Sequence, residues 1–268
     1  MKKPSYAVLI RTFNSQRTLP LTLECLVGQT SPPDQYGFVD SGSTDDTLKI
    51  LPTDSVVHKF VGREFNYSEA INQGLEHVTT DYVFVLSSHM LLIKRAAVEY
   101  ALNLLESGEM YGAAYFTHEV DSEELSHVSI DKANFDGQNG LWNASALIRM
   151  SLLKRRRFRP EVFAAEDQEW ASWLFNSEGK AVARIRNAGA INYNAQGSSF
   201  RKLRNDYIAV AYYSKRERLS WYNIFEVLKS VVSPCGGARL RHRGSQLILA
   251  TRLIRCRSSE PKMKSRYF

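Results

Sequence analysis

Residues 35–51, "QYGFVDSGSTDDTLKIL", decide the fold because an apolar segment passes directly into a polar turn. The apolar residues of 35–40 predict a buried strand, and the Asp-Ser-Gly-Ser run that follows favours a turn. The remainder predicts a loop that enters a helix, with Ser43 as the N-cap and Asp46 in the first turn. A strand, a turn and a helix in this order form the repeating unit of an α/β protein.

The same succession of strand and helix continues through the first 107 residues. Strands are predicted at 6–10, 35–40, 56–60 and 82–87, and helices within 12–30, 41–51, 66–78 and 94–107. Such alternation predicts a mostly parallel sheet, of the Rossmann-like type, with helices on both faces.

The later residues follow a less regular pattern. Strand character is predicted at 111–120, 141–150 and 181–187, a loop-rich excursion at 122–138, and helices at 165–179 and near 201–218, 220–232 and 244–256. We therefore expect two domains: a catalytic α/β domain over residues 1–200 and a basic helical extension over residues 201–268.

The positive charge is concentrated in the predicted extension. The chain has 268 residues and a net charge of +7, yet residues 201–268 alone carry 16 Lys and Arg against 4 Asp and Glu. This asymmetry indicates a polyanionic partner: a membrane surface, a nucleic acid or a phosphorylated substrate. The segment 245–258 mixes Leu247, Ile248, Leu253 and Ile254 with arginines, which predicts a helix at an anionic membrane surface. The alternative is a helix that packs on the catalytic domain or on a second subunit.

Other targeting and partner classes lack their signatures. The apolar run 6–10 is too short for a signal-peptide core, and no run reaches the length of a membrane span. The three dispersed cysteines predict reduced thiols, so we expect a cytoplasmic protein that is peripheral at the inner face of the membrane. No nucleic-acid-binding motif is present and aromatic residues are not interleaved through the basic run after Tyr222, so we expect no nucleic acid partner. The sequence does not predict an oligomeric state.

Polar residues follow three of the predicted strands. They are Arg11–Asn14, Asp40–Ser43 and Ser87–His89, and they should meet in one crevice, because ligands of open α/β sheets bind outside the carboxyl ends of the strands. Neither a G-x-G-x-x-G nor a Walker motif is present, which argues against dinucleotide and P-loop chemistry. Asp40 either accepts hydrogen bonds from a ligand or caps its own turn.

The stretch "EDQEW", residues 166–170, is the second concentration of reactive groups. Asp167 is the candidate general base, with Glu169 pointing away from it and Trp170 as an apolar wall on its side. The alternative is that the acidic residues only complement the dipole of their own helix.

The motifs together resemble family 2 glycosyltransferases. The matching segments are "LIRTFN" (9–14), "VDSGSTDDT" (39–47), "NYSEAINQG" (66–74) and "EDQEW", in the family's order and within residues 5–195. The resemblance implies a GT-A fold and an inverting enzyme that uses a nucleotide-sugar donor.

The resemblance also implies roles for individual residues. Thr12 and Asn14 would lie at the base and ribose, Asp40 would bond the base, and Asp167 would be the catalytic base. The residues expected to bind the nucleotide sugar are Thr12, Asn14, Asp40, Ser43, Arg63, Asn66, Asn72, Ser87, Ser88 and His89.

The chain departs from the family at the metal site. The sequence has Ser87-Ser88-His89 where the family has an Asp-x-Asp that holds Mg²⁺ or Mn²⁺, and Asn192-Tyr193-Asn194 where many members have a His. His89 would be the metal ligand, which suits Mn²⁺ better than Mg²⁺, or the enzyme would be metal-independent. The diphosphate could instead meet His89 itself, or Arg201, Lys202 and Arg204, where the family has a loop that closes over the donor.

The resemblance leads to one expected function and two alternatives. The expected function is transfer of a hexosyl or related sugar to a hydroxyl of a saccharide or lipid-linked acceptor, in bacterial surface polysaccharide synthesis. The alternatives are a catalytically degenerate sugar-nucleotide or polysaccharide-binding subunit, which the lost acidic pair favours, and a nucleotidyltransferase, whose glycine-rich phosphate loop is missing from residues 11–18.

Overall fold

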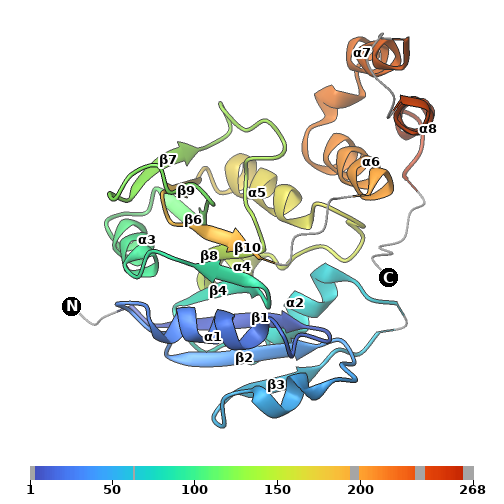
Figure 1. Ribbon diagram of the computed structural model, residues 1–268. Helices are drawn as coiled ribbons and strands as arrows, with labels where there is room; N and C mark the ends of the chain where they lie inside the picture. Colours follow the sequence, from blue (N-terminus) through green and yellow to red (C-terminus); the bar gives the residue numbers. More distant parts are fainter. Residues whose placement is uncertain (1–3, 63, 194–198, 233–238, 262–268) are drawn as a thin grey trace.

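The computed structural model describes residues 4–62, 64–193, 199–232 and 239–261. Its centre is an eight-stranded sheet with the order β3-β2-β1-β4-β8-β6-β9-β7 (Figure 1). The strands are β1 Tyr6–Thr12, β2 Gln35–Asp40, β3 Val56–Lys59, β4 Tyr82–Ser87, β6 Tyr111–Phe116, β7 Ser126–Ile130, β8 Ser145–Arg149 and β9 Ala181–Arg186. Only β7 and β8 run against the others, so the predicted mostly parallel α/β sheet is confirmed.

Helices cover both faces of this sheet, because successive side chains of a buried strand point to opposite sides. Val8 and Phe84 lie in the core under α1 (Leu19–Val27) and α3 (Ala97–Glu106). Their strand neighbours, such as Leu9, lie in the opposite core, which packs against three helices. These are α2 (Tyr67–Leu75), α4 (Met150–Arg155) and α5 (Glu166–Ser177). The sheet thereby holds its strand ends, and the turns that follow them, between two packed layers.

The turn after β2 differs from the expected one. Residues Asp46–Ile50 form a short 3₁₀ helix whose N-cap is Asp45, because the Asp45 carboxylate accepts the Thr47 N–H at 3.0 Å. Ser43 is not the N-cap: its hydroxyl donates to the Asp40 carboxylate at 2.5 Å instead. The prediction for Ser43 was therefore wrong, since the preceding strand offers a stronger, charged acceptor.

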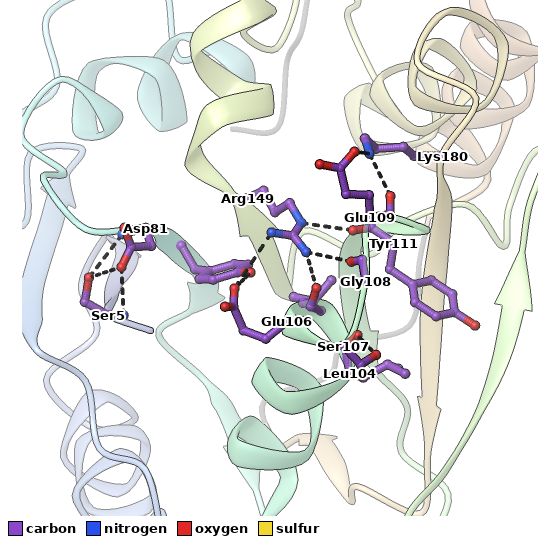
Figure 2. A network of polar contacts seen from close by, with 12 residues as sticks. Ser5, Asp81, Leu104, Glu106, Ser107, Gly108, Glu109, Tyr111, Arg149 and Lys180 are labelled. Atoms are coloured by element: carbon purple, nitrogen blue, oxygen red, sulfur yellow. Dashed lines mark hydrogen bonds and ion pairs between the residues drawn. The ribbon is translucent and has the colours of Figure 1, made fainter. Parts of the chain in front are cut away.

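The strand β8 enters the sheet between β4 and β6 and is antiparallel to both. Arg149, at its end, fixes this insertion by donating to the carbonyls of Gly108 and Tyr111, both at 3.1 Å, and to that of Leu105 (Figure 2). The Leu105 carbonyl belongs to the last turn of α3. A cation is favourable there because the carbonyls at the C-terminus of a helix carry partial negative charge. The predicted loop 122–138 contains another strand, β7, and a two-stranded sheet joins β5 (Met90–Leu92) to β10 (Ala190–Asn192).

The C-terminal segment is helical, as predicted, and its helices lie together at one side of the sheet (Figure 1, orange to red). They are α6 (Phe200–Ala209), α7 (Trp221–Val232) and α8 (Arg239–Cys256), with a π turn at Val210–Ser214 and a 3₁₀ turn at Arg216–Leu219. Leu249 and Leu253 of α8 are buried together with Phe163 and Ala164, which lie just before α5. Leu253 is therefore a core residue, not part of an exposed apolar face. The division into domains at residue 200 stays a prediction.

Within the described residues, no helix combines the length and the apolar character that a bilayer span requires.

Candidate functional site

Two adjoining cavities open at the carboxyl ends of β1, β2 and β4. The strand-end cavity, about 480 Å³, is lined by residues of the turns after these strands, including Thr12, Asn14, Ser41 and Ser88. The larger helix-side cavity, about 900 Å³, extends to the start of α5 and to α6 and α8. Four residues line both cavities and form their common wall: Arg11, Tyr67, Ser87 and His89. The predicted crevice at the strand ends is therefore present.

Asp40 lies behind the strand-end cavity and organises its wall. Its carboxylate accepts four hydrogen bonds, from the Thr12 hydroxyl, the Gly42 N–H, and both the N–H and the hydroxyl of Ser43, at 2.5–3.0 Å. Its side chain is only 2% exposed. Neither Asp40 nor Ser43 lines the cavity, so both hold the turn in the manner of the capping alternative. Contact of Asp40 with the base, and of Ser43 with the nucleotide sugar, stays a prediction.

Asn14 reaches the strand-end cavity because its backbone takes a left-handed conformation, with φ of 48°. Asn is among the residues that tolerate this region best. Its side-chain oxygen accepts the Thr44 N–H at 2.8 Å, and its own N–H donates to the Ser43 hydroxyl at 2.9 Å. The turns after β1 and β2 are thus tied together at the place expected for the ribose.

Asn66 and Asn72 have structural partners and line neither cavity. Asn66 caps α2 by accepting the Glu69 N–H at 3.1 Å, and it donates to the Pro160 carbonyl at 2.8 Å. Asn72 makes a reciprocal pair with the backbone of Phe158, at 2.7 and 3.1 Å. Both therefore fasten the segment 158–160 to α2, and their expected place near the nucleotide stays a prediction. Arg63 lies outside the described residues.

All three residues of the stretch Ser87-Ser88-His89 line the strand-end cavity, and Ser87 and His89 also belong to the common wall. Ser88 is buried, and its hydroxyl lies 2.7 Å from that of Ser15. Ser87 and His89 line both cavities. Burial, together with the positive charge of Arg11, lowers the pKa of His89, so its imidazole is neutral at pH 7. A neutral imidazole can donate or accept a hydrogen bond but brings no positive charge.

The side chains of this wall do not fit a divalent metal ion. No cluster of three or more His, Cys, Asp or Glu that could hold a metal occurs in the part of the chain that the structure describes. Hard cations need several oxygen ligands, usually carboxylates. Here the Ser87 hydroxyl already accepts from the Arg11 guanidinium at 3.4 Å, which places a positive charge beside the expected ligand His89. Asn192 lines the helix-side cavity, and Asn194 lies outside the described residues.

Asp167 lies in the wall of the helix-side cavity, at the first turn of α5. The preceding Ala165 has a left-handed backbone, with φ of 52°, which is strained for a residue with a Cβ atom and typical of functional sites. The Asp167 carboxylate accepts the N–H groups of Asn143 at 3.2 Å and Gln168 at 2.8 Å. Burial, and next the negative charge of Glu166, raise the pKa of Asp167 to about 7. A carboxylate with this pKa is suited to accept a proton at neutral pH.

The neighbours of Asp167 differ partly from the expected ones. Glu169 does point away, since it forms an ion pair with Arg156. Trp170 is no cavity wall, because it is fully buried against Phe158 and Trp173. Trp142 lines the cavity in its place, from the loop before β8.

Asn143 is a site residue that the sequence did not single out, and Arg11, which the sequence placed in the crevice, was given no role there. The guanidinium of Arg11 lies 4.7 Å from the ring centre of Tyr67 and donates to the Asn143 carbonyl at 3.4 Å. Asn143 is buried and also donates through its N–H to Asp167 and through its side chain to Glu166. The available signal was a charged residue inside the otherwise apolar strand "YAVLIRT".

The basic residues of α6 contribute in part. Lys202 and Arg204 line the helix-side cavity, together with Asp206 of the same helix. Arg201 is exposed and is not among the lining residues. Burial lowers the pKa of Arg204, whose guanidinium donates to the Ser245 hydroxyl at 2.8 Å. Two of the three expected basic residues therefore line this cavity.

Several solved structures have a similar fold. A 1–349 segment of TarS from S. aureus, in complex with UDP-GlcNAc, has a TM-score of 0.61 at 13% identity and covers 94% of this chain and 81% of its own. Glucosyl-3-phosphoglycerate synthase from Mycobacterium tuberculosis, with Mn²⁺, UDP and phosphoglyceric acid, has a TM-score of 0.58 at 15% identity, covering 78% and 76%. The mannosyltransferase PcManGT from Pyrobaculum calidifontis, with GDP-Man and Mn²⁺, has a TM-score of 0.56 at 15% identity, covering 98% and 77%.

These likenesses show the fold, which is of the GT-A type. No curated protein sequence matches the chain. The model of the family described as "Glycosyl transferase family 2" matches residues 7–163, which is more than half of the chain. The chain therefore belongs to glycosyl transferase family 2.

Proposed function

We propose that the protein is an inverting glycosyltransferase that moves a sugar, a hexosyl or related group, from a nucleotide-sugar donor to an acceptor hydroxyl. The observation that carries the proposal is Asp167, a carboxylate in the wall of the helix-side cavity whose pKa is raised to about 7. A base of this kind can take the proton of a hydroxyl as its oxygen attacks the anomeric carbon. The carbon–oxygen bond to the diphosphate breaks on the opposite face, which inverts the configuration.

The two cavities divide the donor between them in this proposal. The nucleoside occupies the strand-end cavity, where Thr12 and Asn14 offer polar groups beside the ribose. The sugar and the acceptor occupy the helix-side cavity beside Asp167. The diphosphate then crosses the common wall of Arg11, Tyr67, Ser87 and His89. The UDP and GDP-Man complexes of the structural neighbours support the nucleotide-sugar class of donor.

The acceptor is a saccharide or lipid-linked saccharide, as in bacterial surface polysaccharide synthesis. Support comes from the helix-side cavity, which is large enough for a sugar and an acceptor and is partly walled by α6 and α8. An acceptor attached to a membrane lipid would enter the cavity on the side of these basic C-terminal helices.

The donor class can be tested with a panel of UDP-, GDP- and dTDP-sugars in a thermal-shift experiment. A donor present at about 100 times its Kd should stabilise the protein by roughly 2.7 kcal/mol and raise its melting temperature. Transfer is then measured with the stabilising donor and saccharide or lipid-linked acceptors. If no nucleotide sugar shifts the melting temperature, the proposed function is wrong. Binding without transfer or hydrolysis would instead favour the degenerate binding subunit.

We also propose that the C-terminal helices bind an anionic membrane surface at the inner face of the cytoplasmic membrane. Support comes from one face of α7, where Trp221, Tyr222 and Phe225 are 60%, 72% and 57% exposed. Two cations lie over these rings: Arg257 is 4.6 Å from the Trp221 ring centre and Lys229 is 4.9 Å from that of Phe225. Exposed aromatic residues combined with cations suit the headgroup region of anionic lipid.

Flotation with vesicles tests this membrane surface. The wild type is expected to float with vesicles that contain anionic lipid at physiological salt, and a Trp221→Ser, Phe225→Ser variant to bind at least about tenfold more weakly, because two large apolar side chains are lost. The matched control, Val27→Ser with Met110→Ser, removes two exposed apolar side chains elsewhere and should bind as the wild type does. Absence of wild-type binding, or an equal loss in the control, contradicts the membrane proposal.

A further inference from the structure

Arg11 is a cation without a carboxylate partner at the centre of the site. No ion pair between Arg11 and an acidic side chain is found within the described part of the chain. Its Nε atom is buried with no hydrogen-bond partner, and its two hydrogen bonds, to Ser87 and Asn143, are long at 3.4 Å each. A guanidinium has five N–H donors, and leaving a buried one of them without a partner is costly. The side chain therefore has unused capacity for an anion.

The position of Arg11 identifies the anion. It lies in the common wall between the two cavities, so a molecule that extends from one cavity into the other must pass it. In the proposed function, which this inference rests on, the part of the donor at that point is the diphosphate. Planar N–H pairs of arginine match phosphate oxygens in a two-point geometry. The same wall lacks the carboxylates that would hold a metal ion.

We propose that Arg11 binds the diphosphate of the donor directly and supplies the positive charge there in place of a divalent metal ion. When the bond between the anomeric carbon and the diphosphate oxygen breaks, its electron pair stays on that oxygen, and Arg11 balances the negative charge. His89, which lines both cavities beside Arg11, offers a ring nitrogen to the same group. The cation is held by Ser87, by Asn143 and by the face of the Tyr67 ring.

The proposal is tested by comparing the Kd of UDP, GDP and dTDP with the Kd of their nucleosides, measured calorimetrically in excess EDTA and again with Mn²⁺. We expect the wild type to prefer the diphosphate over the nucleoside by about tenfold or more in EDTA, as a charge-assisted contact predicts. Arg11→Met should erase this preference and leave the nucleoside Kd unchanged, and Arg11→Lys should restore part of it. Lys132→Met, which removes one exposed charge from the loop after β7, should behave as the wild type does.

Three results would overturn the proposal. The preference for the diphosphate could persist in Arg11→Met, it could appear in the wild type only with Mn²⁺, or nucleoside affinity could fall equally in Arg11→Met and Arg11→Lys, which indicates a structural role for Arg11. If none of the three diphosphates binds the wild type, the proposed function itself fails, and that result is distinguishable from the others.

Discussion

The variant Asp167→Asn is expected to transfer sugar about 10²–10⁴-fold more slowly than the wild type, while the affinity for the nucleotide stays nearly unchanged. The amide keeps the size of the side chain but cannot accept the proton. The rate of the wild type should rise with pH through about 7 and then level off, because the base must be ionised and the pKa of Asp167 is raised to about 7. The residual rate of the variant should lack this rise.

The neighbouring carboxylate provides the matched control. The negative charge of Glu166 helps to raise the pKa of Asp167, so Glu166→Gln should move the midpoint of the rate profile to lower pH and retain transfer. Initial rates of transfer across pH 5–9 measure both effects. Loss of transfer in Glu166→Gln together with its retention in Asp167→Asn would overturn the assignment of the base.

Asp167→Asn should also change stability, in the opposite direction from activity. A carboxyl group whose pKa is raised on folding stabilises the protein below its unfolded pKa, and this contribution is lost as pH rises through the folded value. For Asp167 the loss occurs between about pH 4 and about pH 7. The variant should therefore melt at a higher temperature than the wild type at pH 8, and the difference should shrink toward pH 4. This gain separates removal of a buried carboxylate charge from general damage to the fold.

The variant Asp40→Ala is expected to lower the free energy of unfolding by about 3 kcal/mol, since it leaves four donors without their shared acceptor in a buried site. Urea denaturation without any ligand measures this loss. Asp54→Ala, at an exposed turn of the same region, should change the free energy by less than about 0.5 kcal/mol.

The two expectations for Asp40 lead to different results. If its main role is to hold the turns after β1 and β2, stability falls without ligand and nucleotide affinity falls as a consequence. A variant with the stability of the wild type but no nucleotide binding would instead show that Asp40 contacts the base, as the family resemblance implies.

The sequence predicted those parts of the fold that have a local cause. The apolar runs at 6–10, 35–40 and 82–87 became β1, β2 and β4, because a buried parallel strand must be apolar on both faces. The direction of β8 was not predictable, since "SALIR" is apolar whichever way it runs and its partners are distant in sequence. The strand β7 was missed because its polar, partly exposed residues resemble a loop.

In the candidate site, too, the features with a local cause were predictable and those that depend on distant partners were not. Asp167 could be selected from "EDQEW" because an acidic cluster at a helix start is a local signal, and the structure places it in the cavity wall. The partners of Asn66, Asn72 and Asp40 could not be derived, because each depends on which donors and acceptors tertiary packing brings near. The role of Arg11 could not be derived for a related reason: among the described residues it forms no ion pair with an acidic side chain, which is a property of the folded chain.

The insertion of β8 between β4 and β6 gives the sheet an order of assembly during biosynthesis. When the ribosome has released residues 1–144, β4 is paired only with β1, and β6 still lacks both of its neighbours, β8 and β9. The nascent chain then presents open strand edges, which favour association with other chains and need protection. Residues Ser145–Arg149 join the two halves of the sheet, so a chain truncated before residue 145 should require a chaperone and one that extends past β9 should not.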